Sequence, residues 1–144
     1  TVVPPGPADF VHNGFNADPL RRAEVNAYVY ANVIRDIVEQ HNHDYPGIDI
    51  PEFATWVNRT DGYCPGNAWW NGTINFCAGS STYGNTGEIQ QVVEHEFGHG
   101  VNDYILGYQG STGMGEGNSD ILARIAFSSV PDSSALVASG MPIV

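Results

Sequence analysis

The sequence predicts an α+β fold in which helices lie before and after a short group of strands. Apolar residues recur at helical spacing over residues 18–41, and two runs of aromatic and β-branched residues flank an Asn-Gly pair between residues 67 and 77. Two further helical patterns lie between residues 87 and 128. The order helix, strands, helix, helix indicates a small mixed or antiparallel sheet with helices packed against it. We expect one compact domain over residues 1–144, with an irregular lead-in (1–17), an α/β part (18–112) and the start of a helical lobe (113–144).

The first helix is expected from residue 18 to about residue 41. Asp18 and Pro19 are typical of a helix start, because an Asp side chain caps free N–H groups and proline fits the first helical position. The residues that recur at helical spacing are Ala23, Ala27, Tyr30, Ala31, Ile34, Ile37, Val38 and His41. His41 and His43 end this helix, where the helix dipole favours them, and a metal role is the alternative.

The strands are expected over residues 53–57 and in a hairpin over residues 67–77. Asn71-Gly72 stands between two strand-like runs and is a strong hairpin signal. Cys64 and Cys77 bracket this segment, and a disulfide between them would stabilise the fold by roughly 3 kcal/mol. Two free thiols or two further zinc ligands are the alternatives. A disulfide indicates an oxidising compartment, and glycosylation sequons at Asn58 and Asn71 fit an extracellular protein.

The net charge of the chain excludes some classes of binding partner. Sixteen acidic against five basic side chains give a net charge of −11, and no basic stretch exists. This argues against nucleic acid and anionic membrane surfaces as partners. No apolar run reaches the length of a membrane span. The acidic surplus fits solubility or calcium binding, but no EF-hand loop is present, so calcium stays an open alternative.

The strongest motif is the stretch H-E-F-G-H at residues 95–99, within a helical pattern that begins near Gly87. Helical residues at i and i+4 share a face, so His95 and His99 can offer two imidazoles to one metal. Glu96 then lies beside the metal rather than on it. This H-E-x-x-H pattern predicts two zinc ligands and a general base. A surface helix with two solvated histidines is the alternative. The core stripe of the helix is expected to be Ile89, Val92, Val93, Phe97, Val101 and Ile105.

A second pair of candidate residues lies downstream, in a helical pattern over about residues 115–128. Glu116 and Asp120 are again at i and i+4, so both carboxylates share one helical face. One can complete the metal site while the other accepts a hydrogen bond from a ligand histidine and fixes its tautomer. Acidic residues favoured by the dipole at a helix N-terminus are the alternative reading.

Together these motifs resemble those of the gluzincin zinc metallopeptidases, both thermolysin-like and fungalysin-like. H-E-F-G-H followed by G-V-N-D-Y resembles thermolysin's active-site helix, and M-G-E-G-N-S-D at residues 114–120 resembles fungalysin's glutamate helix. G-N-A-W-W-N-G at residues 66–72 resembles the edge strand that lines thermolysin's cleft. The resemblance covers about residues 50–128 and implies a zincin-like catalytic core with one zinc ion. The ligands that it implies are His95, His99 and Glu116.

The resemblance also implies roles for other residues. Glu96 becomes the base that activates water, and Asp120 accepts a hydrogen bond from His95. Tyr108 is the candidate for a tyrosine that stabilises the oxyanion, with a plain aromatic anchor as the alternative. The residues expected to hold the substrate are Asn67, Ala68 and Trp69.

The chain departs from the thermolysin-like pattern in its length. Only about sixty residues precede the cleft strand, one helix follows the third ligand, and no histidine follows His99. We therefore expect a truncated C-terminal helical lobe and the loss of one transition-state donor, which typically costs about 10²–10³ in rate. The function expected is a secreted zinc endopeptidase that acts on peptides or proteins. The alternative is a non-catalytic, zinc-stabilised module or processed fragment, whose apolar tail (135–144) is covered by another chain or a missing lobe.

Overall fold

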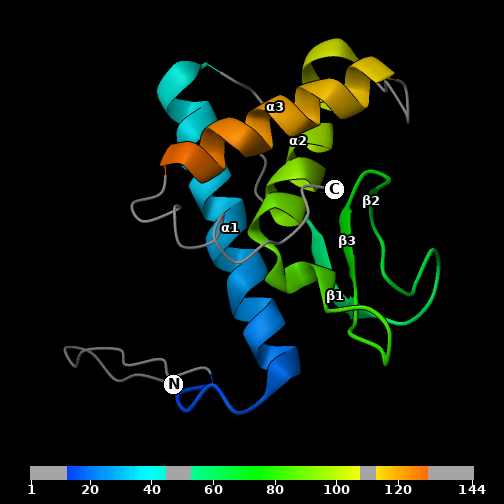
Figure 1. Cartoon of the computed structure of the whole chain (residues 1–144). Coiled ribbons are helices and arrows are strands. Elements are labelled where there is room, and N and C mark those ends of the chain that lie inside the picture. The colour runs from blue at the N-terminus through cyan, green and yellow to red at the C-terminus, as the bar shows by residue number, and fades with distance from the viewer. Residues whose placement is uncertain (1–12, 45–52, 108–112, 130–144) are drawn as a thin grey trace.

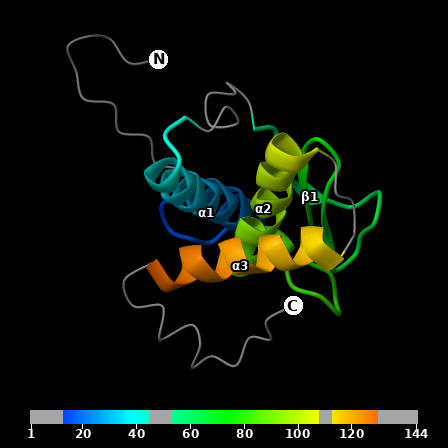
Figure 2. The same cartoon turned by 90° about the horizontal axis from the view of Figure 1, so that it is seen from above.

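The computed structural model describes residues 13–44, 53–107 and 113–129. The elements in chain order are α1 (Pro19–His41), β1 (Thr55–Arg59), β2 (Ala68–Trp70), β3 (Ile74–Cys77), the 3-10 helix η1 (Thr86–Glu88), α2 (Gln90–Leu106) and α3 (Gly113–Ser129). α2 lies between α1 and the sheet, and α3 crosses both α1 and α2 (Figure 1, Figure 2). The predicted α+β class is confirmed, with three helices and a small mixed sheet in the described residues.

The first helix begins and ends where the sequence signals place it. Asp18 Oδ1 accepts hydrogen bonds from the N–H groups of Leu20 at 3.0 Å and Arg21 at 3.3 Å. The predicted core residues Ala23, Ala27, Ile34, Ile37 and Val38 are buried. His41, the last residue of the predicted stripe, is exposed instead, because it lies in the final turn, where Nδ1 donates to the carbonyl of residue 37 at 2.8 Å.

The sheet has the strand order β1-β3-β2, with β1 parallel and β2 antiparallel to β3. The predicted hairpin is present, but Trp70 pairs with Ile74, so its loop contains residues 71–73 rather than Asn-Gly alone. A two-residue type I′ turn needs positive φ at both positions, and of this pair only Gly72 has it, at 92°. Thr73 Oγ1 closes the loop by donating to Asn71 Oδ1 at 3.0 Å.

The hydrophobic core lies between the sheet and the helices. Alternate residues of a strand face opposite sides, and Ile74 and Phe76 of β3 are the two that point toward the helices. Both are fully buried. The residues that complete the buried cluster are Ala27, Ile34, Ile37, Val38, Val93, Phe97, Val101 and Ala126. The helix with the H-E-F-G-H stretch therefore packs directly on the central strand.

The start of this helix differs from the prediction. The predicted start near Gly87 is wrong, because residues 86–88 form η1 and α2 begins at Gln90. The side chain of Asn85 accepts a hydrogen bond from the N–H of Gly87 at 3.0 Å and thereby caps η1.

The predicted core stripe of α2 is correct only in mid-helix. Val93, Phe97 and Val101 are buried, but Ile105 is exposed. Residues 104–106 are all exposed, and Ile105 lines an open apolar pocket together with Ile37 of α1 and Leu122 of α3. In mid-helix α1, α3 and the sheet all contact α2, and polar residues are buried there as well.

Three predictions fall outside the described residues: most of the irregular lead-in, Tyr108 and the apolar tail over residues 135–144. In the part of the chain that the structure describes, no helix is long and apolar enough to cross a membrane.

Candidate metal centre

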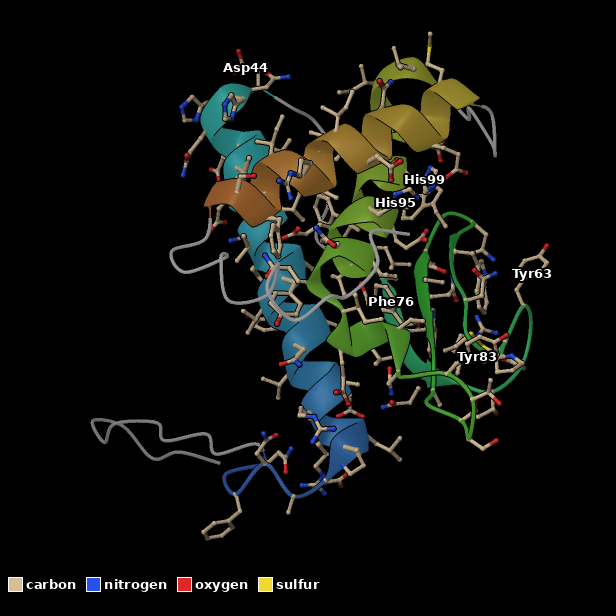
Figure 3. All side chains as sticks on the ribbon, viewed as in Figure 1. Asp44, Tyr63, Phe76, Tyr83, His95 and His99 are labelled. Carbon is tan, nitrogen blue, oxygen red and sulfur yellow. A yellow bond between two sulfur atoms is a disulfide. The ribbon has the colours of Figure 1, made fainter. Side chains whose placement is uncertain are left out.

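The two histidines of the H-E-F-G-H stretch lie one turn apart on α2. His95 and His99 meet edge to face, with ring centroids 4.7 Å apart and planes at 82°. Both side chains are largely buried. Figure 3 shows them beside α3. The alternative of two solvated histidines on a surface helix is therefore wrong.

Glu116, in the first turn of α3, reaches both histidines. Its Oε2 lies 3.1 Å from Nε2 of His95 and 3.4 Å from Nε2 of His99. Tetrahedral zinc, with ligand bonds of about 2.0–2.1 Å, holds its ligand atoms about 3.3 Å apart. Among the described residues these three form the only group of His, Cys, Asp or Glu that could hold a metal ion, with ligand atoms within 4.8 Å of one another. His41 and His43 do not belong to it.

Asp120 binds the opposite nitrogen of the first histidine. Nδ1 of His95 donates to Asp120 Oδ1 at 2.8 Å. An ionised carboxylate can only accept, so this bond places the proton on Nδ1 and a lone pair on Nε2. That lone pair meets an oxygen of Glu116 at 3.1 Å. Two acceptors this close repel unless a proton or a cation lies between them, which is the arrangement that a metal ion relieves.

The second histidine is held in its neutral form. Burial lowers the pKa of His99 below its ordinary value, and the neighbouring His95 lowers it further, although Glu116 and Asp120 oppose the shift. A neutral imidazole keeps the lone pair that a metal needs. Two imidazoles and one carboxylate are a donor set that zinc accepts, and imidazole also suits copper, iron and nickel.

Glu96 lies next to this group on α2 without belonging to it. Its side chain is only 6% exposed. Burial raises the pKa of Glu96 to about 8, and the charge of Glu116 contributes to the same shift. Without a cation nearby this carboxyl keeps its proton at pH 7. A cation held by the neighbouring ligands favours the ionised form, and would make Glu96 a carboxylate base.

Buried hydrogen bonds fix the helix that carries Glu116 against α2. Asn102 Nδ2 donates to the carbonyl of Gly115 at 3.2 Å and to Ser119 Oγ at 3.3 Å, and Ser119 Oγ donates to the same carbonyl at 2.9 Å. At Gly98 an added Cβ would lie 2.9 Å from Ser119 Cα, so the close approach of the two helices needs a glycine. This network was not predicted, although Asn102 and Ser119 each lie three residues after a metal-ligand candidate and therefore on the same helical face as that candidate.

A second missed residue is Glu94, which the apolar stripe of α2 did not predict as buried. Its side chain is 0% exposed. Oε1 accepts from Gln90 Nε2 at 2.7 Å, whereas Oε2 has no hydrogen-bond partner among the described residues. Burial raises the pKa of Glu94 to about 8, against the opposing effect of the Gln90 bond. Glu94 therefore carries a proton at neutral pH.

The edge strand β2 is fixed to the helix that carries the histidines. Trp70 Nε1 donates to Asp103 Oδ2, on α2, at 3.1 Å. The Trp70 ring also stacks on Phe53, with centroids 5.2 Å apart, and Phe53 stacks in turn on Phe97 of α2 at 4.5 Å. The position of β2 is therefore coupled to the position of the metal group.

The three predicted substrate-binding residues differ in whether their main-chain groups are free to bind a peptide. The Asn67 carbonyl accepts from the N–H of Cys77 at 3.2 Å and from the Thr86 hydroxyl at 3.0 Å, so it is used within the fold. Trp69 pairs with a residue of β3 and its main chain also faces inward, because hydrogen-bonded pairs alternate along an antiparallel ladder. The main chain of Ala68 faces the outer edge of β2, which no strand of the described residues covers.

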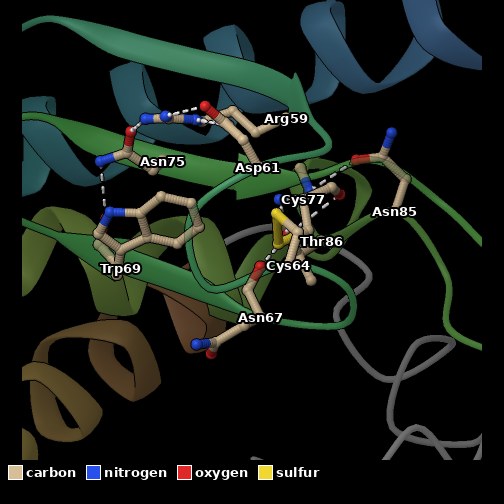
Figure 4. The surroundings of a disulfide bond; sticks show 10 residues. Arg59, Asp61, Cys64, Asn67, Trp69, Asn75, Cys77, Asn85 and Thr86 are labelled. Carbon is tan, nitrogen blue, oxygen red and sulfur yellow. Dashed lines mark hydrogen bonds and ion pairs between the residues drawn. A yellow bond between two sulfur atoms is a disulfide. The ribbon is translucent and has the colours of Figure 1, made fainter.

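Cys64 and Cys77 form the predicted disulfide, which joins the loop before β2 to the end of β3 (Figure 4). The disulfide fits an extracellular protein. The two sequons differ in their surroundings. Asn58 Nδ2 donates to the Leu20 carbonyl at 3.0 Å and to Glu24 Oε1 at 3.3 Å, so a glycan there would require one of these two bonds to be lost. Asn71 lies exposed in the hairpin loop.

Comparison of the chain with protein-family models, with curated proteins and with solved structures finds no match. The likeness to gluzincins therefore depends on the motifs, and the chemistry of the site depends on its own geometry.

Proposed function

We propose that this protein is a secreted, zinc-dependent endopeptidase. The observation that carries the proposal is the meeting of His95, His99 and Glu116 with the buried carboxyl of Glu96 beside them. A zinc ion that only stabilised the fold would normally have four protein ligands and would need no buried acid next to them. Secretion is inferred from the disulfide, since an oxidising compartment maintains such bonds.

Each residue of the site has a separate role in the proposed hydrolysis. His95, His99 and Glu116 would hold the metal, and a zinc ion there supplies Lewis acidity, which polarises a carbonyl and acidifies water. Glu96 takes the proton of the attacking water and gives it to the leaving amine. Asp120 holds His95 in the tautomer that leaves Nε2 unprotonated.

The edge strand supports a peptide as the substrate. An extended peptide docks on an open sheet edge through main-chain hydrogen bonds. Ala68 offers one N–H and one carbonyl at that edge, and Trp70 holds the strand on α2 through its bond to Asp103. A peptide paired with β2 would thereby keep a fixed position relative to the helix that carries His95 and His99.

The test is the Glu96→Gln variant, which keeps the size of the side chain and removes the base. We expect the wild type to bind about one zinc ion per chain and to hydrolyse casein, which is unstructured. The variant should keep the zinc and lose hydrolysis by at least about 10²-fold, the lower end of what a general base contributes. Glu39→Gln, at an exposed position of α1, is the matched control and should change neither quantity.

Unchanged hydrolysis in Glu96→Gln would show that the proposed base is wrong. Zinc in the wild type without turnover of casein would instead favour the non-catalytic module, and light scattering would then show whether it assembles.

A further inference from the structure

The sheet has a second face, turned away from the helices, that carries aromatic side chains. Trp56 of β1 and Trp69 of β2 are both register partners of Asn75 in β3, so the three form one row across the strands. Their neighbours Ile74 and Phe76 face the core, which places the row on the opposite side. We call the following set the outer aromatic face: Trp56, Arg59, Asp61, Tyr63 and Trp69.

Two rings of this face are open to solvent. Trp56 is 60% exposed and Tyr63 is 71% exposed. Trp69 supports Tyr63, whose ring meets it edge to face with centroids 5.4 Å apart, and the Arg59 guanidinium lies 5.0 Å above the Trp69 ring centroid. Gly62 packs so closely that a Cβ there would lie 2.9 Å from the Trp69 ring. The Tyr63 ring therefore packs on an ordered base, and binding through Trp and Tyr side chains, which have few rotatable bonds, costs little conformational entropy.

The polar groups of the face form an ion pair and can still make further hydrogen bonds. Arg59 donates from Nε and Nη2 to the two oxygens of Asp61 at 2.8 and 2.9 Å, and from Nη1 to Asn75 Oδ1 (Figure 4). These bonds use three of the five N–H groups of a guanidinium, and two are left over within the described residues. The Arg59 and Asp61 charges cancel, so the face has no net charge although the chain carries −11.

We propose that the outer aromatic face binds an uncharged polysaccharide. A hexose presents C–H groups on the flat side of its ring, which pack on Trp56 or Tyr63, and hydroxyl groups at its rim. Hydroxyls both donate and accept, so they match the N–H groups of Arg59 and the exposed carboxylate of Asp61 together. Electrically neutral ligands suit a face without net charge.

The Arg59–Asp61 ion pair disfavours two other kinds of ligand that bind aromatic surfaces, single-stranded nucleic acid and proline-rich peptides. A single-stranded nucleic acid needs a positive groove for its phosphates, and Arg59 is already neutralised by Asp61. A proline-rich peptide offers carbonyls but few N–H groups, so it would cover the Asp61 carboxylate without giving it a donor, which is costly. The face lies on the far side of the sheet from α2, and binding there does not depend on the proposed peptidase activity.

Retention on insoluble polysaccharides tests the proposal. Wild type, Trp56→Ala and Tyr63→Ala are incubated with cellulose, chitin and β-1,3-glucan, and the unbound protein is measured. Tyr28→Ala is the matched control, because Tyr28 is an aromatic residue of α1 that is 72% exposed. We expect the wild type and the control to bind at least one of the three polymers. The Trp56 variant should bind about ten-fold more weakly or worse, as the loss of an aromatic anchor implies.

A soluble oligosaccharide with the linkage of the retained polymer should release the wild type. Circular dichroism and thermal melting check that each variant folds. If Trp56→Ala does not fold, Tyr63→Ala takes its place in the comparison. Failure of the wild type to bind any of the three polymers would overturn the proposal. Equal retention of the Trp56 and Tyr28 variants, or capture by a proline-rich peptide alone, would overturn it as well.

Discussion

Replacing Glu94 by Gln should change how the stability of the metal-free protein depends on pH. The Glu94 side chain is fully buried on α2, and one of its oxygens has no hydrogen-bond partner among the described residues. Burial raises its pKa from 4.5 to about 8. The Gln side chain cannot ionise, but it keeps the size of Glu94 and an oxygen that accepts the hydrogen bond from Gln90.

The direction of the effect follows from proton binding. Between pH 4.5 and about 8 the folded protein holds the Glu94 proton and the unfolded chain has lost it, so the free energy of unfolding falls as pH rises. One pKa unit corresponds to about 1.4 kcal/mol, so the rise from 4.5 to about 8 gives a loss of at most roughly 5 kcal/mol over this range. Burial raises the pKa of Glu96 in the same way and adds a second loss of the same sign.

Urea unfolding at pH 5, 6, 7 and 8 in the presence of a chelator measures this dependence. The wild type should lose stability over the series, and Glu94→Gln should lose less and be the more stable protein at pH 8. Glu39→Gln, at an exposed position, should follow the wild type. Parallel profiles for Glu94→Gln and the wild type would show that burial does not raise the pKa of Glu94 in the folded protein.

Three further variants, one of them a double substitution, test the metal centre and the residues that hold it in place. Asp120→Ala removes the acceptor that fixes His95 and should weaken zinc binding by about 10–100-fold in a competition titration; an unchanged affinity would show that this bond does not orient the ring. Gly98→Ala places a Cβ against the backbone of α3 and should cost about 1–3 kcal/mol in urea unfolding, whereas a gain would show that the helices separate easily. Replacing Cys64 and Cys77 by Ser should cost roughly 3 kcal/mol by the same measurement, and no loss would mean that the native contacts alone hold this loop.

Features encoded in short stretches of sequence were predictable. The start of α1 needs only Asp18 and Pro19, since a cap and a proline act within one turn. The facing positions of His95 and His99 follow from helix geometry alone. The Cys64–Cys77 pairing could be expected because the chain holds no other cysteine.

Features that depend on packing between distant segments were not predictable in the same way. The parallel pairing of β1 with β3 joins residues about twenty positions apart and leaves no local pattern. Glu94 is a polar residue in the sequence, and only the packing of other segments against α2 buries it. The outer aromatic face could not be predicted without the strand register. Trp56 and Trp69 lie in one row only because both strands pair with the same residue of β3.

The metal content of the purified protein is the most direct test of the proposed zinc site, because the roles proposed for the three ligands and for Glu96 all require a bound zinc ion. We expect about one zinc ion per chain in the wild type and in Glu96→Gln, measured by mass spectrometry after dialysis against zinc and then against metal-free buffer. His99→Ala and Glu116→Ala each remove one of the three ligands and should retain far less. A wild type without zinc, or zinc retained equally by the ligand variants, would show that these three residues do not form a zinc site.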